Sequence, residues 1–123
     1  MNEDKNMAHC GINDAYVAGL FDGEGNIQFY KIKALEYVRF RLTINQKEVL
    51  EQIRDYFGYG YVGINSGRCW IFVVSTYQES IDFISRVIPY LLIKKEKALV
   101  ALTYLNEHPK RHYRSKHKLV KLR

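Results

Sequence analysis

The chain has 123 residues, 47% of them hydrophobic, and a formal net charge of +6. This length and composition indicate one globular domain with a core of strands and helices. We expect no membrane span and no secretory signal, because no stretch approaches the roughly 20 apolar residues that a bilayer requires and the first residues are polar. Cys10 and Cys69 have neither metal-ligand spacing nor a disulfide framework, so we expect free thiols and an intracellular protein. The sequence does not determine the compartment.

The positive charge is concentrated at the C-terminal end. Residues 94–123 hold ten basic and two acidic residues, a net charge of +8, whereas residues 1–93 hold nine basic and eleven acidic residues, a net charge of −2. Such a basic segment is typical of a nucleic-acid-binding protein, and it also occurs as a solvated tail. We interpret residues 1–123 as one domain, with a core at about 13–105 and a basic tail at 106–123.

The first predicted element is a helix at residues 15–25, AYVAGLFDGEG, capped by Asn13 or Asp14. Its middle residue is a glycine, which costs on the order of 1 kcal/mol relative to alanine when exposed in a helix. Residues with little side-chain bulk share one face of this helix, and they are Ala15, Ala18, Gly19 and Asp22. Such a face wastes core volume unless another helix approaches closely, so we expect it to pack against the same helix of a second copy.

This packing would bring together the acidic ends of two helices. In a parallel pair, two copies of Glu24 converge near the axis, together with carbonyl oxygens of the last helical turn. Carboxylate and carbonyl oxygens are the hard ligands that Mg²⁺ prefers, and a pair of such sites supports phosphodiester hydrolysis. A solvated helix end that stops at glycines is the alternative explanation of Asp22-Gly23-Glu24-Gly25.

The period then changes to that of strands. Residues 26–33 and 36–44 alternate between apolar and polar side chains, which predicts two strands that each bury one face. The second strand directs four apolar side chains to the core, namely Val38, Phe40, Leu42 and Ile44. Its other face carries Tyr37, Arg39, Arg41 and Thr43. The short link between the two strands suggests a hairpin.

The rest of the chain repeats the strand–strand–helix layout. Two capping boxes open helices, at Asn45–Glu48 and at Thr76–Glu79. The remaining elements in chain order are a helix that ends at Gly58, strands at 60–65 and 69–75, a helix from Thr76 to Pro89, and a helix at about 95–105. The predicted order is αββαββαα.

The segment YVAGLFDGEG (16–25) resembles the LAGLIDADG motif of homing endonucleases, which Val17 to Gly25 match in register at all nine positions. TINQKEVL (43–50), GYGYV (58–62) and IPYLLIKKEKA (88–98) resemble further segments of the single-motif branch of that family. The resemblance implies an α+β fold, αββαββα, with a curved antiparallel sheet that lies in the DNA major groove. It also implies a homodimer that makes a staggered double-strand cut in a long pseudo-palindromic site of double-stranded DNA.

The resemblance also implies roles for single residues. Glu24 is the catalytic acid that binds Mg²⁺, for which Mn²⁺ can substitute, and the Gly23 carbonyl is a main-chain ligand. Gln46 corresponds to a polar residue that orders water near the metals, and Lys94 to a basic residue near the scissile phosphate. The alternatives are an ordinary helix start for Gln46 and a solvated lysine cluster for Lys94. Some relatives carry a second basic residue at a position that is Leu50 here.

The polar face of the predicted sheet supplies the candidate DNA-binding residues. They are Asn26, Gln28, Tyr30, Tyr37, Arg39, Arg41, Thr43, Asn65 and Arg68. Arg39 and Arg41 are the best candidates for reading a base, because an arginine can bond both acceptors of a guanine edge. The alternative for each is a phosphate contact, which fixes register without reading sequence.

Three functions remain open on these grounds. The first is a homing nuclease, the second is a maturase that binds intron RNA, and the third is a DNA-binding protein that has kept the fold without the chemistry. Retention of Glu24, Gln46 and Lys94 argues against the third. A basic concave surface suits RNA as well as DNA, so intron RNA stays an alternative partner. The target site does not follow from the sequence, because strand register and bulges decide which side chains reach which base.

Overall fold

A computed structural model describes residues 11–33, 35–67 and 69–108 of the chain. Its elements in chain order are α2 (Asp14–Glu24), β1 (Gly25–Ile32), β2 (Leu35–Ile44), α3 (Lys47–Phe57), β3 (Tyr61–Ser66), β4 (Cys69–Val74), α4 (Tyr77–Val87), the short 3-10 helix η1 (Ile88–Tyr90) and α5 (Lys95–Glu107). The predicted α+β class and the order of strands and helices are confirmed. The predicted roles of Cys10, Arg68 and most of the basic tail lie outside the described residues.

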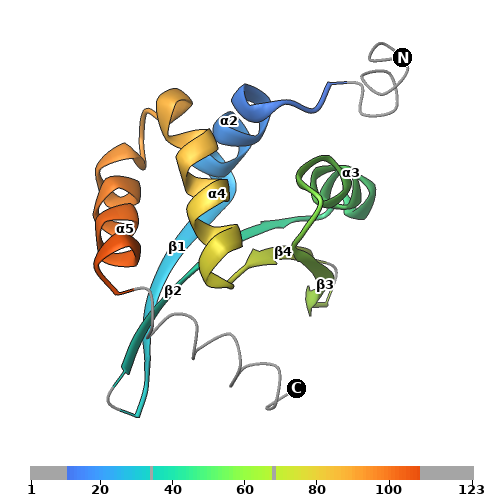
Figure 1. Cartoon of the computed structure of the whole chain (residues 1–123). Coiled ribbons are helices and arrows are strands. Elements are labelled where there is room, and N and C mark those ends of the chain that lie inside the picture. The colour runs from blue at the N-terminus through green and yellow to red at the C-terminus, as the bar shows by residue number, and fades with distance from the viewer. Residues whose placement is uncertain (1–10, 34, 68, 109–123) are drawn as a thin grey trace.

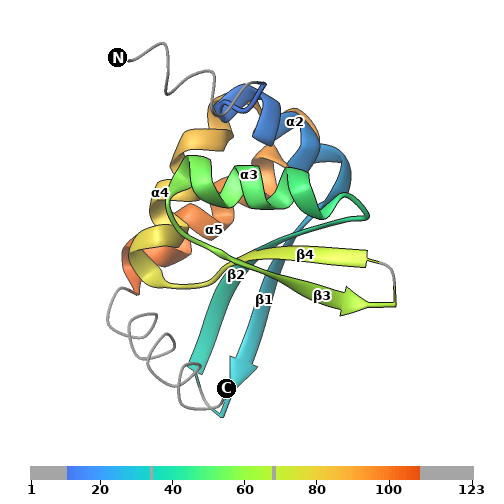
Figure 2. The ribbon, with the colours of Figure 1, turned by 90° about the vertical axis from the view of Figure 1, so that its right-hand side faces the viewer.

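The four strands form one antiparallel sheet in the order β1-β2-β4-β3. Strands β1 and β2 form one hairpin, strands β3 and β4 form another, and the two hairpins join through β2 and β4. That central ladder is short, running from the pair Phe40–Val74 to the pair Ile44–Trp70. Beyond it the two hairpins splay apart, as Figure 2 shows. The divergence makes the sheet curved, as the family resemblance implied.

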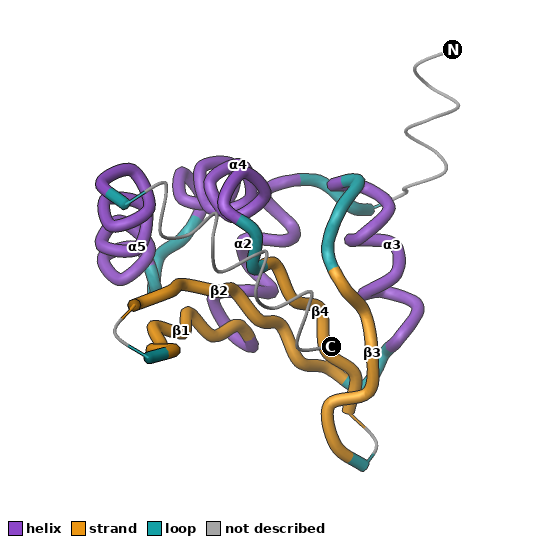
Figure 3. The backbone as a smooth tube through the Cα atoms, turned by 60° about the horizontal axis from the view of Figure 1, so that its bottom comes forward, coloured by secondary structure: helices purple, strands orange, loops and turns teal. Residues whose placement is uncertain are grey.

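The helices lie on one face of the sheet, so that the molecule has two layers (Figures 1 and 3). Phe83 of α4 lies at the centre of the core between the layers. Its ring centroid is 5.7 Å from that of Phe21 on α2, 5.7 Å from Phe40 on β2, 5.2 Å from Phe57 on α3 and 6.1 Å from Phe72 on β4. Burial of large aromatic side chains is a dominant stabilising contribution in such a core. Among the described helices, none covers the opposite face of the sheet.

A polar cluster fixes the start of α2 against α3 and α4. Arg86 of α4 pairs with the Asp14 carboxylate at 3.1 Å, and the Tyr56 hydroxyl of α3 donates to the same carboxylate at 2.9 Å. The guanidinium also lies 4.5 Å from the centroid of the Phe57 ring. Burial lowers the pKa of Arg86, but its hydrogen bonds to Asp14 and Tyr56 outweigh burial and raise that pKa, so the cation is retained. The cluster therefore orients α2 relative to the rest of the helical layer.

The start of α3 differs from the sequence prediction. Gln46 is its N-cap, with an extended backbone, and makes no side-chain capping hydrogen bond. Asn45 is not the cap, because its side-chain oxygen accepts a hydrogen bond from the Cys69 thiol at 3.4 Å instead. Leu50, where some relatives carry a basic residue, is completely buried.

The two later helices begin and end close to their predicted bounds. Thr76 is the N-cap of α4 as predicted, but its side chain makes no capping hydrogen bond. Helix α5 extends to Glu107, two residues beyond the predicted end. Over the ranges that the structure describes, none of the helices has both the length and the hydropathy that crossing a bilayer requires.

Candidate active site

Helix α2 leads directly into strand β1 and places Glu24 where the helical layer meets the sheet. Of the two predicted caps, Asn13 opens the helix, because its side chain accepts a hydrogen bond from the Tyr16 main-chain N–H at 2.8 Å. Gly25 is both the C-cap of α2 and the first residue of β1. A Cβ at Gly25 would overlap the ring of Phe21, which is fully buried and cannot move aside. Only glycine therefore fits this junction, and Glu24 emerges from it exposed to solvent.

Glu24 and Gln46 line the same hollow, which has a volume of about 300 Å³. Its lining residues come from the end of α2, the end of β2, the start of α3 and the start of β4, and they are Glu24, Thr43, Ile44, Asn45, Gln46 and Cys69. The structure thus brings two of the three predicted catalytic residues together. Sequence reasoning missed the presence of Asn45 and Cys69 in this hollow. The pairing of Ile44 with Trp70, the neighbour of Cys69, brings the thiol to the end of β2, and this register was not predicted from the sequence.

Lys94, the third predicted catalytic residue, is held at the end of α2 rather than in the hollow. Its ammonium group donates to the main-chain oxygen of Asp22 at 2.6 Å. That oxygen lies two residues before Glu24, in the last turn of the helix. A cation at the C-terminus of a helix is stabilised by the helix dipole and by the free carbonyl groups of the last turn. The structure therefore gives Lys94 a defined place near Glu24, and it is not one member of a solvated lysine cluster.

The Asp22 carboxylate faces the inside of this chain. It accepts hydrogen bonds from the main-chain N–H groups of Leu92 at 2.7 Å, Ile93 at 3.0 Å and Lys94 at 2.9 Å. Burial alone would raise the pKa of the Asp22 carboxyl, but the three N–H groups and the nearby Lys94 charge lower it below its ordinary value. Asp22 is therefore ionised and is part of the internal structure of the site. Its predicted place on an exposed interface face is wrong.

The donor atoms around Glu24 are mostly oxygen atoms. Besides the Glu24 carboxylate, the junction offers the Gly23 carbonyl, and the hollow offers the side-chain oxygens of Asn45 and Gln46. Oxygen donors of this kind suit Mg²⁺ and Mn²⁺. Within residues 11–33, 35–67 and 69–108, no three His, Cys, Asp or Glu side chains come together. The described part of the chain thus has a donor set of the right chemistry, with Glu24 as its charged member.

The candidate DNA-binding residues on β1 and β2 are cross-strand neighbours. Asn26 pairs with Arg41, Gln28 with Arg39 and Tyr30 with Tyr37, so these side chains form rows on one face of the sheet. Arg39 Nε donates to Gln28 Oε1 at 2.6 Å, and its guanidinium lies 5.0 Å from the centroid of the Tyr30 ring. These contacts hold the Arg39 side chain in place before any ligand is bound.

Arg41 is linked to the second hairpin across the sheet. Its Nη2 donates to Asn65 Oδ1 at 3.3 Å, and Asn65 lies at an irregularity of register between Ile64 and Ser66. Irregularities of this kind bend a strand and redirect its side chains. Tyr61, which sequence reasoning missed, is 58% exposed and pairs with Val73, the β4 partner of Arg41. The alternation along residues 60–65 could have indicated Tyr61 as a further candidate.

Tyr37 does not fit the role predicted for it. Its side chain has no exposed surface, and its ring lies 5.7 Å from that of Tyr30. A residue without exposed surface cannot contact a base or a phosphate without rearrangement. Alternation along β2 correctly assigned Tyr37 to the outer face, but burial on that face depends on which groups pack there, which alternation does not report.

The exposed surface of α2 is narrower than predicted. Ala18 has no exposed surface and belongs to the core, so its predicted place at the interface is wrong. Ala15, Gly19 and Gly23 are exposed and lie along one side of the helix at spacings of four. Nothing lies within 4 Å of a Cβ built at Gly19 or at Gly23. No contact within the described chain therefore requires glycine at these two positions.

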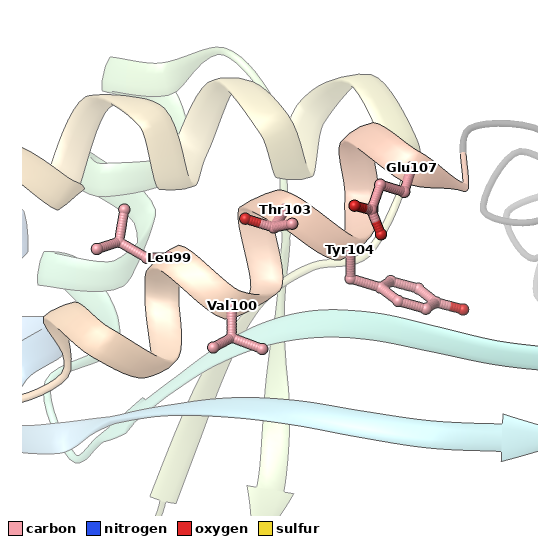
Figure 4. A pocket seen from close by; sticks show the side chains of 5 residues that line it. All are labelled: Leu99, Val100, Thr103, Tyr104 and Glu107. Atoms are coloured by element: carbon pink, nitrogen blue, oxygen red, sulfur yellow. The ribbon is translucent and has the colours of Figure 1, made fainter.

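A second hollow, of about 400 Å³, lies on α5 and carries different chemistry. Its lining residues are Leu99, Val100, Thr103, Tyr104 and Glu107 (Figure 4). Glu107 is its only carboxylate, and the Tyr104 hydroxyl is already engaged with the Glu36 main-chain oxygen at 2.7 Å. The residues that line this mostly apolar hollow lack the amide groups found beside Glu24, so the hollow at Glu24 is the stronger candidate site.

Known proteins resemble this chain over the same helices and strands. A family profile described as LAGLIDADG endonuclease matches residues 17–108, from the motif of α2 to the end of α5. The chain belongs to the LAGLIDADG endonuclease family. Its sequence is 27% identical over 103 residues to the DNA endonuclease I-CreI of Chlamydomonas reinhardtii. The match covers 76% of this chain and 63% of that relative, so the chain spans less than two thirds of the relative's length.

Solved structures support the LAGLIDADG fold independently. The homing endonuclease I-CvuI, in complex with DNA in the presence of Mg, matches with a TM-score of 0.66 and 24% identity over 80% of this chain and 69% of that one. A second I-CvuI complex was obtained in the presence of Ca. The LAGLIDADG meganuclease I-AabMI, bound to uncleaved DNA, matches with a TM-score of 0.70 and 24% identity over 85% of this chain and 42% of that one. These solved relatives were thus obtained with DNA, and the two I-CvuI complexes in the presence of Mg or Ca.

Proposed function

We propose that this chain is a site-specific homing endonuclease that acts as a homodimer on double-stranded DNA. The observation that carries the proposal is the junction of α2 with β1. It presents Glu24 beside the Gln46 hollow, at the root of a strand whose following residues form the polar rows of the sheet. A cleavage group and a DNA-binding surface of this kind share one short segment of the chain.

DNA binding falls to the outer face of the sheet. A curved antiparallel sheet can enter the major groove, where each base pair presents a distinct pattern of donors and acceptors. Arg41 and Asn26 form the row nearest to Glu24, and Arg39 and Gln28 form the next one outward. Successive rows are about 7 Å apart along the strands, which is close to the length of two base-pair steps. Successive rows therefore suit contacts with base pairs that are two steps apart in one half-site.

Cleavage falls to the residues around the end of α2. Glu24 and the Gly23 carbonyl would hold Mg²⁺, which when bound supplies a Lewis acid for the phosphate and lowers the pKa of its water. The Gln46 side chain can orient a water molecule in the hollow through its amide group. Lys94 brings a positive charge to the same helix end, where negative charge grows on the phosphate during hydrolysis.

Assembly of two copies supplies what one chain lacks. Gly19 and Gly23 are exposed and unconstrained within the described chain, and each exposed helical glycine costs on the order of 1 kcal/mol relative to alanine. Close approach of a second α2 explains both glycines. It also brings a second Glu24 to the first, and it places two cuts in one duplex within a single complex.

A cleavage selection tests the proposed function. The protein is incubated with a library of randomised DNA duplexes and Mg²⁺, and the cut ends are sequenced, with an EDTA-treated sample as control. We expect one pseudo-palindromic site with staggered ends, and no cutting with EDTA. Tight binding without cutting in Mg²⁺ or Mn²⁺ would favour a DNA-binding protein that has lost the chemistry. Preference for folded intron RNA over duplex DNA would favour a maturase.

A further inference from the structure

The segment between η1 and α5 is held by one carboxylate. Three consecutive main-chain N–H groups, of Leu92, Ile93 and Lys94, all point to Asp22 on α2. The Lys94 ammonium donates back to the Asp22 main-chain oxygen, so both the main chain and the side chain of Asp22 are used. Such a set of contacts fixes the conformation of residues 92–94, because a buried N–H without a partner is costly.

This segment presents unlike side chains in two directions. Leu91 is buried in the core, whereas Leu92 is 89% exposed and Ile93 is 76% exposed. Lys94 is half-buried at the end of α2. A neighbouring pair of aliphatic side chains with this much exposure is unusual beside a tightly hydrogen-bonded backbone, and it indicates a surface that another molecule covers.

The exposed pair lies next to the glycine side of α2. Asp22, to which the segment is bonded, is three residues from Gly19 and adjacent to Gly23 on the same helix. The hydrogen bonds to Asp22 thus hold residues 92–94 against the last turns of the helix that carries both glycines, and we infer that Leu92 and Ile93 extend the surface that a second copy covers. Both side chains are apolar, and apolar area is typical of the buried core of an interface between two copies.

We propose that Asp22 is a positioning residue that couples dimer assembly to cleavage. By holding residues 92–94, it directs Leu92 and Ile93 to the second copy and keeps Lys94 at the helix end beside Glu24. The inference rests on the proposed homodimeric endonuclease and adds to it a second interface element and a role for the first acid of the motif.

Three variants and one control separate this role from general stability. Asp22→Asn keeps the shape of the side chain but turns an NH₂ group toward main-chain donors. Lys94→Met removes the cation, and the double variant tests whether Asp22 acts through Lys94. Asp82→Asn is the matched control, because Asp82 also accepts hydrogen bonds, from Tyr59 and Arg86, but on another part of the molecule. The measurements are amide hydrogen exchange, sedimentation equilibrium, and single-turnover cleavage well above the dimer dissociation constant.

We expect Asp22→Asn to expose the amides of residues 92–94 to exchange and to weaken the dimer by about tenfold. We also expect it to slow cleavage by about tenfold even when all protein is dimeric. In the Lys94→Met background, Asp22→Asn should slow cleavage no further. Asp82→Asn should leave all three quantities at the wild-type level.

Several outcomes would overturn the inference. In the wild-type protein alone, fast exchange of the amides of residues 92–94, at the rate of exposed amides, would overturn it. So would an Asp22→Asn dimer of normal affinity, or a double variant whose cleavage rate falls by the product of the single effects. If the wild-type protein cuts no DNA, the proposed endonuclease fails and the link to cleavage fails with it. Exchange and sedimentation then still decide whether Asp22 holds the segment against a second copy.

Discussion

The end of α2 and the outer face of the sheet are built in different ways. At the end of α2, positions are fixed by main-chain contacts, since Gly25 cannot accept a side chain beside Phe21 and Asp22 binds three N–H groups. On the sheet, Arg39 and Arg41 are held by bonds to other side chains, and those bonds are accessible to solvent in part. The difference teaches that cleavage should respond to the change of a few atoms, whereas recognition should be spread over several replaceable pairs.

The largest effect is expected from Glu24→Gln, which keeps the shape of the side chain and removes its charge. Loss of metal binding should raise the activation free energy of cleavage by about 4 kcal/mol and so slow cleavage about a thousandfold. DNA binding through the sheet should survive. A gel-shift assay and a cleavage assay on one site measure the two effects. Glu107→Gln, in the hollow on α5, is the matched control and should cut normally. Cleavage by Glu24→Gln at the wild-type rate would mean that the acid is structural.

Gly19→Leu tests the assembly of the cleavage centre. The added side chain meets open space within the chain, and leucine favours a helix over glycine, so the monomer should melt no lower than the wild type. At a close helix crossing, overpacking costs about 1–3 kcal/mol, so the dimer should weaken by up to about a hundredfold. Sedimentation equilibrium measures this, with Ser85→Leu on the exposed side of α4 as control. A Gly19→Leu dimer of normal affinity would contradict the proposed crossing.

Asp22→Asn should also change stability in a manner that depends on pH. The pKa of Asp22 is lowered in the folded chain, so ionised Asp22 stabilises the fold above the unfolded pKa of about 4. This contribution is lost as pH falls through the lower pKa of the folded state. Urea unfolding should show a cost of about 2 kcal/mol at pH 7 that shrinks below pH 4. Asp55→Asn, which changes an exposed carboxylate, should show neither the cost in stability at pH 7 nor its dependence on pH. A cost for Asp22→Asn that is independent of pH would contradict the role of the Asp22 charge.

The smallest effect is expected on the sheet. Arg41→Ala should weaken binding by about 1 kcal/mol and relax the base preference at one position of each half-site. Arg54→Ala removes the same charge from α3, where the guanidinium pairs with Asp55, and should leave the preference unchanged. Selection from a randomised library measures both variants. An unchanged preference in Arg41→Ala would assign Arg41 to a phosphate, in which case the salt dependence of binding should fall instead.

The sequence by itself determined the parts of the protein that depend on local periodicity. Alternation along residues 36–44 located β2 and its buried residues Val38, Phe40 and Leu42, because adjacent strand residues always point to opposite faces. Asn13 was one of two candidate caps and Gly58 was the predicted helix end, both from their own chemistry, since both act within one helical turn. The motif around Glu24 was recognised for the same reason, as all its residues are consecutive.

Only the tertiary structure decided which residues from distant parts of the chain contact these helices and strands. Asp22 was assigned to an interface because its helix face is small, yet residues 92–94, about seventy positions away, occupy its carboxylate. Tyr37 was assigned to the exposed face by alternation, yet its side chain is buried. Asn45 was assigned to a cap, yet the pairing of β2 with β4 brings Cys69 to its side chain. In each case the outcome depends on groups brought close by the folding of the whole chain, and periodicity and capping chemistry report only on near neighbours in sequence.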